Sequence, residues 1–222
     1  MGGRGKKHYR RRSPRIEPEP ALLVVTEGEK TEPLYFEALR GKLHLVATRI
    51  EIQKADGTDP KSVVAYAISQ RAQRRREAKK GEGVEYEAVW VVFDSEQKLG
   101  TQELNDALQL AGNEGILVAM SAPCFEYWFI LHYEYTTQYM CSYQEAADRL
   151  KRHVLGYVKN DPPVDELLTR VATAVHNAEK CRRAQDAADA DLPRTDVDLL
   201  VVTMNCSARK HHRLIGCPDN AD

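Results

Sequence analysis

The chain has 222 residues and a formal net charge of −1, with 42% hydrophobic and 29% charged residues. These values are ordinary for a globular protein of one domain, and the length suffices to bury a hydrophobic core. The five cysteines form no CxxC pair, which argues against a disulfide framework and against a structural zinc site. No apolar run approaches a membrane span and no signal-peptide pattern follows the basic start, so we expect a cytoplasmic protein without a membrane partner.

The near-neutral net charge hides two basic clusters. Residues 3–15 (GRGKKHYRRRSPR) are almost purely cationic, and residues 71–80 (RAQRRREAKK) form a second cluster. Such clusters are either solvated surface or binding sites for a polyanion, and together they favour nucleic acid. The side chains expected to contact a nucleic-acid backbone are Arg71, Arg74, Arg75 and Arg76.

Taken in chain order, residues 1–20 are charged and end in EPEP, which predicts a flexible arm. Residues 21–26 (ALLVVT) form a continuous apolar run typical of a buried strand. A helix is predicted from Thr31 to about Gly41, with Pro33 in its first turn. Weak alternation over 46–53 indicates a second strand.

The pattern then repeats. Asp59 is a good N-cap for a helix that ends near Gly81, and residues 86–93 (YEAVWVVF) read as the third strand. A helix over 101–110 and a strand over 116–120 follow. After Ser121-Ala122-Pro123 comes an aromatic helix, CFEYWFILHYE.

This β-α alternation predicts an α/β fold, a Rossmann-like and mostly parallel sheet of about four strands with flanking helices. We expect the arm to be followed by a core over 21–141, a helical C-terminal extension over 142–205 and a polar, frayed tail over 206–222. The run 198–204 (DLLVVTM) is compatible with either a further strand or a final helix.

Acidic residues follow two of the predicted strands. Glu27 comes after the first strand, and Asp94 and Glu96 come at the end of the third. Functional groups of open α/β sheets gather at the carboxyl ends of the strands, where these carboxylates would repel one another without a counter-charge. Mg²⁺ prefers oxygen ligands and would relieve that repulsion. The competing interpretation is that each is a turn residue or a helix cap.

The segment after the fourth strand offers three further candidates. Glu126 lies in the first turn of the aromatic helix and is either another metal ligand or a partner of the helix dipole. His132 is a supporting residue or a structural histidine. Cys124 near the helix start is a weak candidate for a nucleophile. Gly28 either adopts a positive φ or lets a phosphate approach the backbone, although neither GxxxxGK[ST] nor GxGxxG is present.

Four segments resemble the RloB-like family. Three of them look like its signatures: LLVVTEGEKTEPLYFEAL (22–39), VVFDSE (91–96) and SAPCFEYWFILHYE (121–134). The fourth, LPRTDVDLLV (192–201), resembles the C-terminal motif of the family with departures. The resemblance covers about residues 21–202.

This resemblance implies a Toprim-like fold, related to OLD-type nucleases, and nuclease activity dependent on Mg²⁺ or Mn²⁺. The Toprim glutamate falls on Glu27, and the Asp-x-Asp motif falls on Asp94 and Glu96, where glutamate replaces the usual aspartate. The second glutamate of OLD-type nucleases matches Glu32. Ala122 stands where asparagine is usual.

In the implied mechanism Asp94, Glu96 and Glu32 hold the metal, while Glu27 acts as general base or completes the metal shell. Lys30 would stabilise charge on the phosphate. Family members are associated with antiphage defence, which makes DNA or RNA (tRNA included), a defence partner protein and a second copy of the chain the expected partners. The alternatives are a non-catalytic binding module and a nucleotidyl-transfer or nucleotide-hydrolysing enzyme.

Overall fold

The computed structural model describes residues 21–46, 50–95, 99–188 and 193–218. Its centre is a sheet in the order β2-β1-β3-β4-β5, in which the first four strands are parallel and β5 is antiparallel to β4. The strands are β1 (Ala21–Thr26), β2 (Ile50–Lys54), β3 (Tyr86–Asp94), β4 (Leu117–Ala122) and β5 (Arg194–Thr195). This arrangement is Rossmann-like and confirms the predicted fold class.

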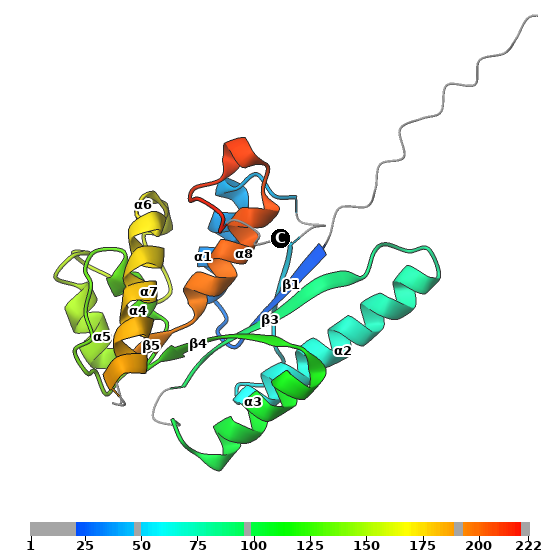
Figure 1. Ribbon diagram of the computed structural model, residues 1–222, viewed down its shortest axis with the longest axis horizontal. Helices are drawn as coiled ribbons and strands as arrows, with labels where there is room; N and C mark the ends of the chain where they lie inside the picture. Colours follow the sequence, from blue (N-terminus) through cyan, green and yellow to red (C-terminus); the bar gives the residue numbers. More distant parts are fainter. Residues whose placement is uncertain (1–20, 47–49, 96–98, 189–192, 219–222) are drawn as a thin grey trace, which may run out of the picture.

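Helices cover both faces of the sheet (Figure 1). One face is covered by α2 (Pro60–Lys79) and α3 (Gln102–Glu114). The other face is covered by α1 (Thr31–Lys42), α4 (Glu126–Leu131), α5 (Tyr143–Leu150), α6 (Val164–Thr169), α7 (Val171–Ala188) and α8 (Val197–Ser207). A 3₁₀ helix, η1 (Lys210–His212), follows α8.

The continuous apolar run of β1 serves two separate cores. Leu22 and Val24 pack with α1, α4 and α8, whereas Leu23 and Val25 pack with α2 and α3. Successive side chains of a strand point to opposite faces, so a strand covered on both faces must be apolar at every position. This is why ALLVVT does not alternate with polar residues.

The helix boundaries follow local sequence signals. Asp59 caps α2 by accepting a hydrogen bond from the Ser62 amide at 2.9 Å, and Pro60 occupies the first position. Thr101 caps α3 in the same way, and Gly115 ends that helix with a φ of 63°. A left-handed backbone at a helix end favours glycine because any Cβ is strained there.

The helical extension completes the sheet. The chain over 198–204 is part of helix α8, which settles the ambiguity between strand and helix in that segment. Just before α8, Thr195 pairs with Ser121 of β4 in the added antiparallel strand. The predicted basic arm over 1–20 lies outside the described residues, as do residues 47–49 of the second strand, which was predicted over 46–53.

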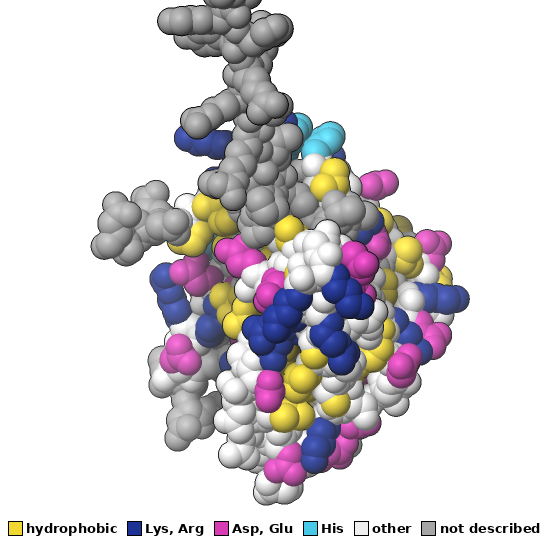
Figure 2. Space-filling model, turned by 90° about the vertical axis from the view of Figure 1, so that its right-hand side faces the viewer, with side chains coloured by type: hydrophobic (Ala, Val, Ile, Leu, Met, Phe, Trp, Pro, Cys, Tyr) yellow, Lys and Arg dark blue, Asp and Glu magenta, His cyan; other side chains and the backbone are white. Residues whose placement is uncertain are grey.

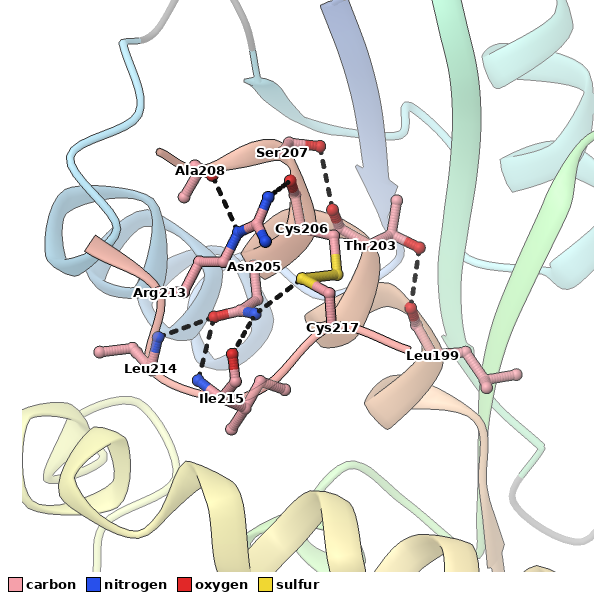
Figure 3. Close-up of a disulfide and its surroundings, with 10 residues drawn as sticks. All are labelled: Leu199, Thr203, Asn205, Cys206, Ser207, Ala208, Arg213, Leu214, Ile215 and Cys217. Atoms are coloured by element: carbon pink, nitrogen blue, oxygen red, sulfur yellow. Dashed lines mark hydrogen bonds between the residues drawn. A yellow bond between two sulfur atoms is a disulfide. The ribbon is translucent and has the colours of Figure 1, made fainter. Parts of the chain in front are cut away.

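The C-terminal tail corrects two expectations. Its described part, to residue 218, folds back on α8, and Cys206 and Cys217 form a disulfide (Figure 3). Asn205 holds the returning chain, because its Oδ1 accepts from the Leu214 amide at 2.8 Å and from the Ile215 amide at 3.2 Å. The tail is therefore packed up to that point, and one pair of the cysteines is joined.

Across the described residues, no helix combines the length and the apolar character needed to cross a bilayer.

Candidate active site

The strand order reverses between β1 and β3, and the first two predicted acidic residues lie at that point. The Glu27 amide donates to the Val92 carbonyl of β3 at 2.9 Å, and the Asp94 amide donates to Glu27 Oε2 at 3.2 Å. The crevice beyond the carboxyl ends of the strands at such a reversal is where open α/β sheets bind ligands. The structure thus brings Glu27 and Asp94 together in the place where the fold favours a site.

Glu32 lies in the first turn of α1, and its charge acts on Asp94. Its side chain is buried, with 7% of the residue exposed. A Cβ placed on Gly28 would lie 2.0 Å from Glu32 Oε2, and Gly28 has no positive φ. The glycine therefore leaves room for the Glu32 carboxylate, and of its two predicted roles the positive φ is not adopted.

Glu126 approaches from the start of α4, just beyond β4, and is fully buried. Its Oε1 accepts a hydrogen bond from the Tyr157 hydroxyl at 2.9 Å. Glu126 Oε2 and Asp94 Oδ1 are buried and have no hydrogen-bond partner among the described residues. Buried polar atoms are nearly always satisfied, so two unpartnered carboxylate oxygens at one edge of a sheet indicate a place for a ligand.

The charges of these residues are coupled. Burial raises the pKa of Asp94 well above its ordinary value, and the neighbouring carboxylates of Glu32, Glu126 and Glu27 raise it further. Burial and then the Glu126 charge likewise raise the pKa of Glu32. Like charges in a partly desolvated space disfavour ionisation. We call Glu27, Glu32, Asp94 and Glu126 the carboxylate cluster.

The helical extension supplies a cation and a hydroxyl that sequence patterns did not indicate. The Lys159 carbonyl accepts from Thr31 Oγ1 at 2.6 Å, which ties this loop to the start of α1. Partial burial lowers the pKa of Lys159, but three carboxylates of the cluster outweigh this effect and raise it. Lys159 and Tyr157 lie in a loop with no motif, and only the fold shows that they face the cluster.

Two predicted site residues, Glu96 and Lys30, are not part of the carboxylate cluster that the structure describes. Glu96 is outside the described residues. Lys30 is exposed at the N-cap position of α1, and its charge acts on Glu29, which itself pairs with Lys54 at 2.6 Å. Lys30 thus lies beside the cluster in sequence, while the lysine whose charge acts on Asp94 is Lys159.

His132 and Cys124 have structural surroundings. The ring Nδ1 of the fully buried His132 donates to the Trp128 carbonyl at 2.9 Å, which leaves Nε2 to accept from the Tyr35 hydroxyl at 3.2 Å. Burial lowers the pKa of His132 to about 3, so the ring is neutral. Burial, then the Glu126 and Asp94 charges, raise the pKa of the Cys124 thiol, which opposes a nucleophilic role.

The arginines of α2 lie near the amino ends of the strands, whereas the carboxylate cluster lies at their carboxyl ends. They bind groups that precede strands β3 and β4. The contacts are Arg71 with Glu114 at 2.8 Å, Arg74 with the Val84 carbonyl at 2.8 Å, and Arg75 with Glu85 at 3.1 Å. Arg76 is exposed. Figure 2 shows Lys and Arg side chains gathered on one face with acidic side chains among them. Much of this charge is therefore balanced within the protein, and the fold does not bring it to the cluster.

The donor chemistry of the cluster suits a hard divalent cation, because carboxylate oxygens are the ligands that Mg²⁺ prefers. The two unpartnered oxygens of Asp94 and Glu126 agree with that chemistry. Within the residues that the structure describes, however, no group of three or more His, Cys, Asp or Glu side chains is gathered closely enough to hold a metal ion. The residue types and their position thus suit the cation. The side chains, however, do not lie close enough together to form a complete ligand set.

The four segments singled out in the sequence meet at this edge. Thr195, from the last segment, lies with its hydroxyl 3.0 Å from that of Ser121, which in turn pairs across the strands with Asp94. A family described as RloB-like protein matches residues 22–204, a range that includes the whole carboxylate cluster and Lys159. No curated protein and no solved structure matches the chain. Because the family match spans most of the sequence, the chain belongs to the RloB-like family.

Proposed function

We propose that this protein is a metal-dependent endonuclease that uses Mg²⁺ or Mn²⁺ to cleave nucleic-acid phosphodiesters. The observation that carries the proposal is the convergence of four carboxylates, from the ends of β1, β3 and β4 and the start of α1, at the reversal point of the sheet. Their mutual repulsion calls for a positive charge, and a divalent cation with a bound phosphate supplies the matching chemistry.

In this proposal Asp94 and Glu32 would hold the cation, with Glu96 as a further ligand outside the described residues. Glu126, with one buried oxygen that has no partner among the described residues, would add to the ligand set. The bound metal would polarise the phosphoryl group and lower the pKa of a water molecule. Glu27 would accept the proton of the attacking water or complete the shell.

A charged side chain at the start of α1 would interact with the substrate phosphate. Lys30 is exposed beside the crevice and would act as a point charge toward the substrate. The arginines of α2 would contact a nucleic acid only if it extends to the amino ends of the strands. The family resemblance supports a role in antiphage defence, with DNA, RNA or tRNA as substrate and with a defence protein or a second copy as partner.

The direct test is cleavage of labelled DNA, tRNA and other RNA with Mg²⁺ or Mn²⁺. We expect products from the wild type and none from Asp94→Asn or Asp94→Ala. Glu87→Gln is the matched control, since Glu87 is an exposed carboxylate near the other end of the same strand. Identical traces for the wild type and Asp94→Ala on every substrate would refute the proposal.

A non-catalytic binding module is the second candidate. It is favoured by one observation, namely that the described side chains form no complete metal site. This alternative expects nucleic-acid or protein binding that survives Asp94→Ala and does not respond to metal. Binding measured with and without a chelator, alongside the cleavage assay, separates the two. Product analysis with labelled nucleotides would detect nucleotidyl transfer or nucleotide hydrolysis.

A further inference from the structure

The loop between α5 and α6 lies against the carboxylate cluster. Three contacts fix it in place: the Thr31 hydroxyl bonds to the Lys159 carbonyl, the Tyr157 hydroxyl bonds to Glu126 Oε1, and an isolated bridge joins Val158 to Asp161. One of these contacts reaches the carboxylate cluster at Glu126, and another reaches Thr31, the residue before Glu32. The helical extension is therefore one wall of the site.

Lys159 projects its charge from this wall. Its Nζ lies 4.5 Å from the centre of the Tyr143 ring, which holds the ammonium by a cation–π contact. Within the described part of the chain, Lys159 makes no ion pair within 4.0 Å, although the charges of Glu126, Asp94 and Glu32 act on it. The lysine is thus near the carboxylate cluster but separated from it.

Lys159 thus places a positive charge beside a group of buried carboxylates. A phosphodiester group suits this position, because its oxygens would accept hydrogen bonds from the ammonium and would bind a cation held by the carboxylates. The ammonium contacts the Tyr143 ring and is not paired with a described carboxylate, so its charge is available to a ligand.

The geometry points to Lys159 as a residue of the site that contacts the substrate phosphate, presented by a loop of the helical extension. This inference rests on the proposed function, since it concerns the same crevice and the same substrate class. It adds a residue outside the three signature segments. It also gives the extension a direct role in substrate binding.

The test uses binding rather than cleavage. Short fluorescent single-stranded DNA and RNA oligonucleotides are titrated with the full chain in Ca²⁺, over a series of salt concentrations. We expect Lys159→Ala to weaken binding roughly tenfold, because a charge-assisted hydrogen bond is lost. The slope of log affinity against log salt should also fall by about 0.7, the value for one phosphate contact on a single strand.

Two variants make the result specific. Lys159→Arg should keep the salt slope of the wild type, and Lys151→Ala should change nothing, because Lys151 is an exposed lysine of the same segment paired with Asp148. Thermal melting confirms that each variant is folded. Unchanged affinity and slope in folded Lys159→Ala would overturn the inference, and so would a wild type that binds no oligonucleotide.

The outcomes also separate this inference from the proposed function. A wild type that binds with a Lys159-dependent slope but cleaves nothing supports the phosphate contact and counts against the nuclease. A wild type that cleaves while Lys159→Ala binds and cleaves equally well supports the nuclease and overturns the role of Lys159.

Discussion

Asparagine at position 94 should stabilise the metal-free protein while removing its proposed activity. The substitution keeps the shape of the side chain but removes a negative charge that faces three other carboxylates. One oxygen of Asp94 is buried without a partner among the described residues, and leaving such an atom unsatisfied costs about 1–3 kcal/mol. For a chain of this size 1 kcal/mol corresponds to about 2–4 °C in Tm, so we expect Asp94→Asn to raise Tm by about 2–12 °C.

The stabilisation by Asp94→Asn should depend on pH. The pKa of Asp94 in the folded state lies above its value in the unfolded state, so protonation of this group favours the folded state. That contribution is fully present below the unfolded pKa, about 4, and is lost as the pH rises through the folded pKa. The advantage of Asp94→Asn should therefore be large at neutral pH and small below about pH 4.

The assay is thermal or urea unfolding of wild type and Asp94→Asn across pH in a chelating buffer, then with Mg²⁺ added. Mg²⁺ should stabilise the wild type according to its affinity and leave Asp94→Asn almost unaffected. Glu87→Gln should match the wild type throughout. A variant that is less stable than the wild type at neutral pH would show that Asp94 is held by favourable contacts and that the cluster is not repulsive.

Three further predictions concern the surroundings of the site. Gly28→Ala should lower Tm and weaken Mg²⁺-induced stabilisation, because its Cβ would lie 2.0 Å from Glu32 Oε2; unchanged melting with and without Mg²⁺ would contradict this. Because burial lowers the pKa of His132 to about 3, the free energy of unfolding should fall by about 1.4 kcal/mol per pH unit as the pH drops below the ordinary histidine pKa of about 6.5. Urea unfolding of His132→Gln should lack this dependence on pH. Cys206→Ser should lower the unfolding free energy, measured by urea unfolding, by about 3 kcal/mol because the disulfide to Cys217 is lost. Fully reduced wild type should lose the same amount. No difference between the oxidised wild type and the variant would count against the pairing.

Local sequence signals were sufficient for the main elements of the fold. The apolar runs predicted β1, β3 and β4 because strands covered on both faces must be apolar throughout, and Asp59 marked the start of α2 through its cap. Strand order followed less directly. The reversal between β1 and β3 that brings Glu27 and Asp94 together depends on how the helices pack, and sequence spacing alone left it open.

The rest of the site depends on tertiary contacts. Tyr157 and Lys159 reach the cluster because α5 packs beside α4 and the loop after α5 is bonded to Glu126 and Thr31, and no local pattern encodes that approach. The sequence is compatible with Glu126 as a metal ligand or as a partner of the helix dipole, and its complete burial, with one oxygen unpartnered among the described residues, favours the first interpretation. The pairing of Cys206 with Cys217 arises from the tail folding back on α8, which a count of cysteines does not reveal.

The central claim is that the carboxylate cluster binds a divalent metal. The most direct measurement is a crystal structure of the protein soaked in Mn²⁺, with anomalous data to locate the ion. We expect an anomalous peak in the crevice between Glu27 and Asp94, and no peak there in Asp94→Asn crystals. A wild-type crystal at saturating Mn²⁺ with no peak at the cluster would contradict the proposed site.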